Sequence, residues 1–535
     1  MLDYTKNFGF RHKSGVLMPV SSLPSKYGIG SFGKAAHDFI DFLDETKQKC
    51  WQVLPLNPTS YGDSPYQSFS TFAGNPYFVD LDILVEEGLL DKEDLAKYDW
   101  GTKEDQVDYG KIYGARLEVW HKAFDKFIEN ENPEFDKFCE DEKSWLDDYA
   151  MYMAISKQEN TSWHNWESGL AKRKARAMAA YKKEHQKEIT FWKFLQFKFF
   201  EQWAKVKAYA NEQGIRIIGD LPIYVSDDGS DVWAHPELFD MDKDLSLRNV
   251  AGVPPDAFSA DGQLWGNPVY KWRAHKKSGY QWWKDRMAAA LKLYDVVRID
   301  HFRGFEAYYS VPAGDKTAVN GKWVKGPGIE LFQEAGLINT GEFNIIAEDL
   351  GVITPEVEEL LKGCGYPGMK ILQFAFDGIH NPDNSYLPHN IIENSIVYPG
   401  THDNNTTLGW WKELSEAGKE YCIEYGAWES DDDICDKIIT MAFASHAKLA
   451  VVAMQDWLDL KADARMNTPS TSSNNWAWRL KKGELDDRLS ERILRKTKVY
   501  ARYTKTIVDE IIEVEDPEDI QDEIVIEVVD ATTEM

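Results

Sequence analysis

Eight short apolar runs, each ending in polar residues, constrain the fold of this chain more than any other feature. They lie at residues 15–20, 51–56, 215–219, 296–299, 344–347, 369–374, 395–398 and 450–454. Near-continuous hydrophobic runs of this length are typical of buried parallel strands. Most of the segments between them have helical patterns, and strands that alternate with helices predict a parallel α/β architecture. Eight such units favour a closed (β/α)8 TIM barrel over an open sheet.

The spacing of the runs is uneven, which predicts additions to the barrel. About 160 residues separate the second run from the third, and much of 84–213 reads as amphipathic helix, so we expect a largely helical subdomain there. Residues 221–272 are rich in Pro, Gly, Asp and aromatics, and they predict a long active-site loop. We therefore expect one catalytic barrel domain over 1–508, followed by an acidic C-terminal tail over 509–535.

Charge and cysteine content narrow the possible partners and location. The net charge of −28 disfavours nucleic acid and anionic membrane surfaces, so we expect neither as a partner. No apolar run is long enough to span a membrane, and the polar N-terminus does not resemble a secretory signal. Five cysteines, without any C-x-x-C pair, are typical of reduced thiols in the cytoplasm. We expect a monomer or a weak homo-oligomer.

Carboxylates follow four of the predicted strands. Asp220 follows the third run, Asp300 the fourth, Glu348 the fifth and Asp403 the seventh. Any one of them could be a helix cap. However, the carboxyl ends of barrel strands meet at one mouth, where active sites are built. Four carboxylates that converge there repel one another, which is costly unless the chemistry requires them.

Cleavage of a glycosidic bond requires such a cluster. Its transition state resembles an oxocarbenium ion, whose positive charge carboxylates stabilise. One carboxylic acid protonates the leaving oxygen, and in a retaining enzyme a second carboxylate attacks the anomeric carbon. The aromatic content, with 20 Trp, 25 Tyr and 26 Phe, also suits the binding of sugar rings, although large cores need aromatics too.

Several long motifs resemble one known family over nearly the whole chain. The most specific are WQVLPLNPTSYGDSPYQSFSTFAGNP, GDLPIYVSDDGSDVWAHPELF, GVPPDAFSADGQLWGNPVY, VVRIDHFRGF, AEDLGVITPEV, PGMKILQFAFD and GTHDNNTTLGWW. In these the chain resembles the amylomaltases, which are the 4-α-glucanotransferases of the α-amylase-like clan. The resemblance implies transfer of an α-1,4-glucan segment to the 4-hydroxyl of another glucan or of glucose, with retention of configuration and through a covalent glucosyl-enzyme.

The resemblance also implies the roles of the three catalytic carboxylates. Asp300 would be the nucleophile, Glu348 the general acid and then the general base, and Asp403 the carboxylate that stabilises the transition state. The residue pattern selects the cluster but does not by itself assign these roles. Arg298 precedes Asp300 by two positions, so on a strand it shares the same face and can pair with it. The same alternation predicts that His301 points away from Asp300.

Further residues are predicted to bind substrate. Asp220 is expected to support the catalytic carboxylates, and His402 to bind sugar hydroxyls as in the family. The others are Tyr66, Ser64, Gln263, Trp265, Asp377 and Asn467. In one loop the chain departs from the family pattern, because Ser470 and Asn474 replace the usual glycines, which predicts a less free backbone there.

No cofactor and no metal are expected. The chain has no P-loop and no H-E-x-x-H motif, and its cysteines and histidines do not cluster at zinc-binding spacings. Two alternatives to a glucanotransferase stay open at this point. A retaining α-glucan hydrolase would use the same machinery with water as the acceptor, and a non-catalytic glucan-binding scaffold would need none of the three carboxylates. We expect maltooligosaccharides and α-1,4-glucans as substrates.

Overall fold

A sheet of eight parallel strands forms the centre of the computed structural model, which describes residues 12–255, 259–339, 343–377, 380–471 and 473–503. The strands are β1 (Lys13–Leu17), β2 (Cys50–Gln52), β3 (Arg216–Leu221), β6 (Val296–Ile299), β9 (Ile345–Ala347), β10 (Gly368–Ile371), β11 (Ser395–Tyr398) and β12 (Leu449–Ala453). Each predicted apolar run overlaps one of these strands. The predicted acidic tail, 509–535, lies outside the described residues.

The sheet is closed into a barrel. Neighbouring strands follow the order β10-β11-β12-β1-β2-β3-β6-β9, and every pair is parallel. The two ends of this order meet where the Ala347 N–H donates to the Pro367 carbonyl at 3.0 Å. At the same seam the side chain of Asp349 accepts a hydrogen bond from the Met369 N–H at 2.6 Å. The predicted (β/α)8 fold is therefore confirmed.

Two strands are shorter than the apolar runs that predicted them. β2 ends at Gln52, although the buried apolar run continues to Leu56. Pro55 has no N–H to donate to a ladder, so this segment is buried without being paired over its whole length. β10 ends at Ile371, where the chain enters the 3-10 turn η7 (Leu372–Ala375). An apolar run in this sequence therefore marks residues that are buried near the barrel mouth, and only some of them pair with a neighbouring strand.

Side chains along the strands alternate between two buried environments. Leu17 and Ile218 belong to an apolar cluster that receives side chains from all eight strands and therefore fills the barrel. Val16 and Ile217, one position earlier, belong to the larger cluster between the barrel and its helices. This alternation is the expected period of a strand, and the interior is a packed core rather than a pore.

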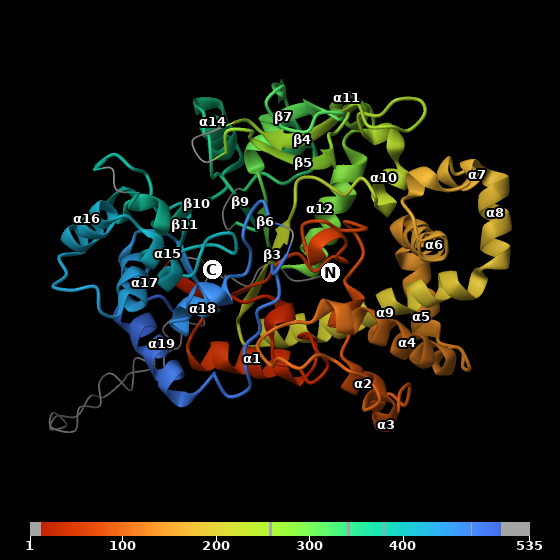
Figure 1. The fold of residues 1–535 in the computed structure, drawn as a ribbon, viewed down its shortest axis with the longest axis horizontal. Helices are drawn as coiled ribbons and strands as arrows, with labels where there is room; N and C mark the ends of the chain where they lie inside the picture. Colours follow the sequence, from red (N-terminus) through yellow and green to blue (C-terminus); the bar gives the residue numbers. More distant parts are fainter. Residues whose placement is uncertain (1–11, 256–258, 340–342, 378–379, 472, 504–535) are drawn as a thin grey trace, which may run out of the picture.

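A helical subdomain lies between β2 and β3, on the right of Figure 1. Its helices are α2 (Leu81–Glu86), α3 (Lys92–Leu95), α4 (Tyr109–Phe127), α5 (Pro133–Asp141), α6 (Lys143–Glu159), α7 (Ser168–Ala171), α8 (Ala175–Glu184) and α9 (Gln186–Glu212). The long helix α9 packs against α6 and against the barrel helix α1 (Lys34–Glu45). The buried Gln196 of α9 also exchanges two hydrogen bonds with the backbone of Gly74, at 2.7 and 2.8 Å. These bonds fasten the long segment after β2 to the subdomain.

A second, antiparallel sheet covers one side of the barrel mouth, at the top of Figure 1. Its order is β5-β4-β7-β8, formed by β5 (Gln263–Pro268), β4 (Asn249–Val253), β7 (Ala307–Pro312) and β8 (Lys322–Lys325). Residues 221–272, predicted to form a long loop, thus contain β4, β5 and the helix α10 (Ser230–Ala234). The register of β4 shifts between Val250 and Gly252, and such an irregular strand does not produce an alternating apolar pattern.

The remaining helices surround the barrel. They are α11 (Trp272–Lys277), α12 (Gln281–Leu293), α13 (Ile329–Glu334), α14 (Pro355–Cys364), α15 (Thr407–Glu413), α16 (Glu416–Gly426), α17 (Ile434–Ala444), α18 (Met454–Trp457) and α19 (Asp487–Val499). Among the described residues, no helix is both long enough and apolar enough to cross a membrane.

Candidate active site

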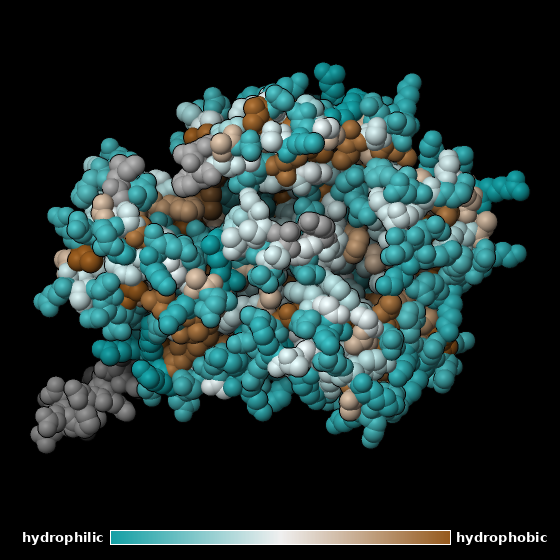
Figure 2. Space-filling model, in the orientation of Figure 1, coloured by the Kyte–Doolittle hydropathy of each residue, from teal (hydrophilic) through white to brown (hydrophobic). Residues whose placement is uncertain are grey.

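A cavity of about 660 Å³ is formed at the carboxyl ends of the barrel strands. Its walls come from the segments after β2, β3, β6, β9, β11 and β12, and from β5 of the second sheet. The surface is also hollowed near the middle of Figure 2. Nine of the predicted site residues line the cavity. They are Ser64, Tyr66, Gln263, Trp265, Asp300, Glu348, His402, Asp403 and Asn467.

Strand alternation explains why polar groups from distant parts of the sequence converge here. Asp220 follows the interior residue Ile218 by two positions, and Glu348 follows the interior residue Ile346 by two. Since the side-chain period of a strand is two, both carboxylates point into the barrel mouth. The interior core of the barrel therefore continues upward into a polar layer, which forms the floor of the cavity.

Arg298 connects two carboxylates of this layer. Its Nη1 donates to Asp220 Oδ1 and Oδ2 at 2.8 and 2.6 Å, and to Asp300 Oδ1 at 3.0 Å. The Arg298 side chain is only 4% exposed, so its charge is little screened by water. Asp220 and Arg298 do not line the cavity themselves but lie directly behind Asp300. Among the described residues Asp300 Oδ2 has no hydrogen-bond partner, and it is available to a ligand.

Glu348 is held by the backbone rather than by a side chain. Its Oε2 accepts a hydrogen bond from the His301 N–H at 2.7 Å, and its Oε1 accepts one from the Leu350 N–H at 2.8 Å. His301 has a φ of 48°, in the left-handed region, because the chain turns immediately after β6. That turn aims the His301 N–H at Glu348 and places the two catalytic segments side by side.

Asp403 and His402 form the opposite wall with Tyr66. Asp403 Oδ1 accepts a hydrogen bond from Asn467 Nδ2 at 2.6 Å, and its Oδ2 lies 3.4 Å from His402 Nε2. The ring of Tyr66 stacks on that of His402 with centroids 5.0 Å apart. The Tyr66 hydroxyl donates to Asp220 Oδ2 at 2.8 Å, which links this wall to the arginine network. The Tyr66 N–H donates to Ser64 Oγ at 3.2 Å.

The three candidate catalytic carboxylates have different pKa values. Burial, together with repulsion from Asp300, raises the pKa of Glu348 to about 7. Burial also raises the pKa of Asp300, to about 6, while the charge of Arg298 opposes that rise. Because Arg298 bonds directly to Asp300, Asp300 ionises first and Glu348 retains the proton near neutral pH. Burial acts on Asp403 as well, but His402 and Asn467 outweigh it and hold the pKa of Asp403 well below its usual value.

The side of the cavity formed by the second sheet carries Trp265 and Gln263. Both lie on strand β5, and Trp265 Nε1 donates to Gln263 Oε1 at 3.1 Å. The Trp265 ring meets the His301 ring edge-on, with centroids 4.8 Å apart. His301 lines the cavity as well, although strand alternation would turn its side chain away from that of Asp300, because the alternation ends with β6 at Ile299. Tyr224, whose ring lies 6.2 Å from that of Trp265, also lines the cavity and was not predicted.

The loop that closes the cavity after β12 has an unusual backbone. Ser470 and Asn474 have φ values of 65° and 61°, and Trp476 has a φ of 60°. These are left-handed conformations, which glycine adopts at less cost than any other residue. The glycines of the family pattern would suit the first two positions, so Ser470 and Asn474 keep the conformation that glycine favours. Trp476 lies against Tyr66, with ring centroids 5.7 Å apart.

Asp377 is not brought to this cavity. The predicted strand extended to residue 374, which would have placed Asp377 just beyond the strand end. β10 instead ends at Ile371, and η7 separates Asp377 from the strand by a full turn, on the exposed surface. Cavity-lining residues that the sequence did not single out for substrate binding are Gly62, Gln67, Pro222, Ile223, Tyr224, Gly262, Leu264, Asn267, Thr471, Asn475 and Trp476. Most of them lie within the motifs that carry the family resemblance or in the loop after β12, but periodicity alone gave none of them a binding role.

The described residues contain no group of three or more His, Cys, Asp or Glu side chains arranged to hold a metal ion. The charges at the cavity floor instead pair with one another through Arg298 and His402.

The fold and the site together define a barrel enzyme whose paired carboxylates at the cavity floor suit cleavage of glycosidic bonds. Comparison with known proteins narrows this class. A family model described as 4-alpha-glucanotransferase matches residues 18–486. The chain belongs to the 4-alpha-glucanotransferase family, as its motifs implied.

Several named relatives align with this chain over almost their whole length. The 4-alpha-glucanotransferase of Streptococcus pneumoniae is 49% identical over 505 residues, which cover 93% of this chain and 99% of the relative. That of Clostridium butyricum is 49% identical over 488 residues, which cover 91% of this chain and 100% of the relative. Among solved structures, an amylomaltase from Streptococcus agalactiae in complex with acarbose is 42% identical, with a TM-score of 0.89 over 92% of this chain and 100% of that one.

Proposed function

We propose that this 4-α-glucanotransferase moves a segment of an α-1,4-glucan to the 4-hydroxyl of another glucan or of glucose by double displacement. The observation that carries the proposal is the position of Asp300, bonded to Arg298 at 3.0 Å, on the same cavity floor as Glu348, whose pKa burial raises to about 7. A nucleophile and a proton donor thus share one cavity floor, as a retaining mechanism requires. A scaffold that only binds glucan would gain nothing from this costly arrangement.

The first displacement cleaves the donor. Asp300 Oδ2 attacks the anomeric carbon, the bond from that carbon to the leaving 4-oxygen breaks, and the Glu348 proton passes to this oxygen. Arg298 keeps Asp300 ionised before the attack. Asp403, ionised at any working pH, lies across the cavity, where it stabilises the positive charge that develops on the sugar ring.

The second displacement forms the product. The ionised Glu348 accepts the proton of an acceptor 4-hydroxyl, the hydroxyl oxygen attacks the anomeric carbon, and the ester bond to Asp300 breaks. Each reacting group returns to its starting state. Tyr66, stacked on His402, offers its exposed side to the donor sugar, while Trp265 and Gln263 border the acceptor side. We assign no substrate contact to Asp377, which lies away from the cavity.

A retaining hydrolase would differ only in using water for the second step. Family membership favours transfer over hydrolysis. Incubation with maltotriose alone distinguishes them. A transferase gives glucose and a ladder of longer maltooligosaccharides with almost no gain in reducing ends. A hydrolase gives one new reducing end for each bond cleaved, and that result would overturn the proposal.

The substrates, the location and the assembly state of the enzyme complete the proposal. Maltooligosaccharides and α-1,4-glucans are the substrates that the site suits, and we propose a cytoplasmic enzyme, since the five cysteines are unpaired. Size-exclusion chromatography with light scattering would test the expected monomer or weak homo-oligomer.

A further inference from the structure

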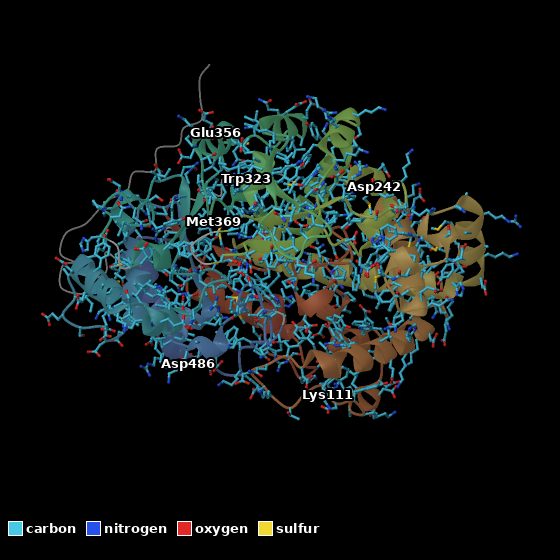
Figure 3. All side chains as sticks on the ribbon, turned by 45° about the horizontal axis from the view of Figure 1, so that its top comes forward. Lys111, Asp242, Trp323, Glu356, Met369 and Asp486 are labelled. Atoms are coloured by element: carbon cyan, nitrogen blue, oxygen red, sulfur yellow. The ribbon has the colours of Figure 1, made fainter. Side chains whose placement is uncertain are left out.

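Trp323 stands apart from the other tryptophans of the chain. All twenty lie within the described residues, and among them Trp323 is the exposed one, with 41% of its surface accessible. It lies on β8, the edge strand of the second sheet, and Figure 3 labels it above the barrel. An exposed tryptophan on a rigid strand is a costly feature of a free surface, and it is typical of binding sites.

The ring is fixed before any ligand arrives. The guanidinium carbon of Arg303 lies 3.8 Å from the ring centroid, and Arg303 itself is only 5% exposed. The cross-strand partner Tyr309 contacts the ring edge-on, with centroids 5.2 Å apart. Two buried neighbours thus support one side of the indole, and the rest is open to water. A ligand that stacks on it does not have to order the side chain first.

A pair of charged residues lies near this ring in the second sheet. Lys325 lies two residues further along β8 and therefore on the same face of the sheet as Trp323. It forms an ion pair with Glu306. Among the described residues the indole N–H of Trp323 has no hydrogen-bond partner. One apolar platform, a carboxylate, an ammonium group and an N–H donor are the parts from which sites for neutral polar ligands are built.

The platform is attached to the two segments that carry the catalytic pair. Arg303 follows Asp300 by three residues, and its Nη1 donates to the carbonyl oxygen of Val352. Val352 follows Glu348 by four residues, so the backbone path between them spans at most about 14 Å. Trp323 does not line the catalytic cavity. The ring is therefore tied, through Arg303, to the segments that follow both Asp300 and Glu348.

We propose that Trp323, with Lys325 and Glu306, forms an α-glucan-binding subsite outside the catalytic cavity, at which one glucosyl ring of a long chain stacks on the indole. This inference rests on the proposed function, since it assumes that the cavity binds the same glucan. The subsite holds long substrates and does not act on short ones, which end before they reach it. It therefore sets a preference for chain length.

The test compares a short and a long substrate in the same variants. Trp323→Ala should raise the KM for long linear amylose five- to tenfold, while the KM for maltotriose changes less than twofold. Trp323→Phe keeps an aromatic face and should lie between the wild type and Trp323→Ala. Trp428→Ala is the matched control, because Trp428 is a half-buried tryptophan that also lies under a cation, the ammonium group of Lys437 at 5.5 Å. It should leave both KM values unchanged.

Direct binding provides the second measurement. Affinity electrophoresis in gels that contain amylose, on a Glu348→Gln background, should show weaker retardation when Trp323→Ala is added. Equal changes for both substrates, or a lower melting temperature with an unchanged KM ratio, would show that Trp323 only packs against Arg303. Failure of the wild type to disproportionate maltotriose would instead refute the proposed function, so the two failures are distinguishable.

Discussion

At the scale of single residues, the proposed catalytic pair shows how neighbouring contacts can give two similar carboxylates different pKa values. Asp300 and Glu348 both lie half-buried at the cavity floor, and the loss of water there alone would raise both pKa values together. A single contact, the 3.0 Å bond from Arg298 Nη1 to Asp300, breaks that equivalence. Glu348 receives only backbone N–H groups, so it remains the group that retains a proton.

This difference predicts the pH dependence of transfer. The attack requires ionised Asp300, so kcat/KM should fall as pH drops below about 6. The leaving oxygen requires protonated Glu348, so kcat/KM should also fall as pH rises above about 7. Initial rates on maltotriose across pH should therefore give a bell, whose two limbs belong to the coupled pair.

Glu348→Gln tests whether the fall of kcat/KM at high pH belongs to Glu348. It should lower transfer from maltotriose by about 10²–10⁴-fold and remove that fall. An α-maltosyl fluoride donor, whose fluoride leaves without a proton, should recover much of the rate of the first step. If the variant loses as much rate with the fluoride donor as with maltotriose, Glu348 does not act as the proton donor.

Trp265 is expected to favour a sugar over water as the acceptor. Its ring lines the cavity on the side of the second sheet and is held edge-on by His301. Trp265→Ala should lower the ratio of transfer to hydrolysis, with a loss of about 1–3 kcal/mol of acceptor interaction, the scale of base stacking on aromatics. Release of glucose and of reducing ends, measured side by side, gives the ratio. An unchanged ratio would remove Trp265 from the acceptor site.

At the scale of structural elements, the loop after β12 carries strain next to the cavity. Ser470 has a φ of 65°, which costs a residue with a Cβ about 1–2 kcal/mol relative to glycine. Ser470→Gly should therefore raise the free energy of unfolding by about 0.5–1 kcal/mol, after the larger chain entropy of glycine is subtracted. Thr468→Gly is the control, because Thr468 lies in the same loop, is exposed and has no positive φ. Urea denaturation should show stabilisation by the first change only.

The elements also show what the sequence could predict. Eight barrel strands were predictable because a strand buried on both faces must be apolar along its length. Asp220, Asp300, Glu348 and Asp403 were predictable because they follow those strands. The second sheet was not predictable, since β8 reads KWVK and β4 contains a register shift at Gly252. Tyr224 and Trp476 were missed for a related reason: they come from irregular segments, and only the folded chain brings them to the cavity.

At the scale of the whole molecule, the site forms a self-contained charge network. In the proposed mechanism, Asp300 and Asp403 stabilise the positive charge that develops on the sugar and Glu348 supplies the proton, so no step requires a Lewis acid. Dialysis against a chelator should leave the rate of maltotriose disproportionation unchanged. A loss of rate that a divalent cation restores would contradict this expectation.

The closure of the barrel has a consequence for how the enzyme can be altered. At the seam between β9 and β10, the Asp349 carboxylate accepts the Met369 N–H at 2.6 Å, in the place where a backbone carbonyl would serve between ordinary strands. Gly368 faces this carboxylate so closely that any Cβ there would lie 2.3 Å from Asp349 Oδ2. A side chain therefore reinforces the backbone bond from Ala347 to Pro367 that closes the circle of strands, directly beside Glu348, the proposed proton donor. Substitutions at Asp349 or Gly368 should therefore shift the position of Glu348. A redesign of the reaction that must keep this carboxylate in place should leave both residues unchanged, and one that aims to move it can start from them.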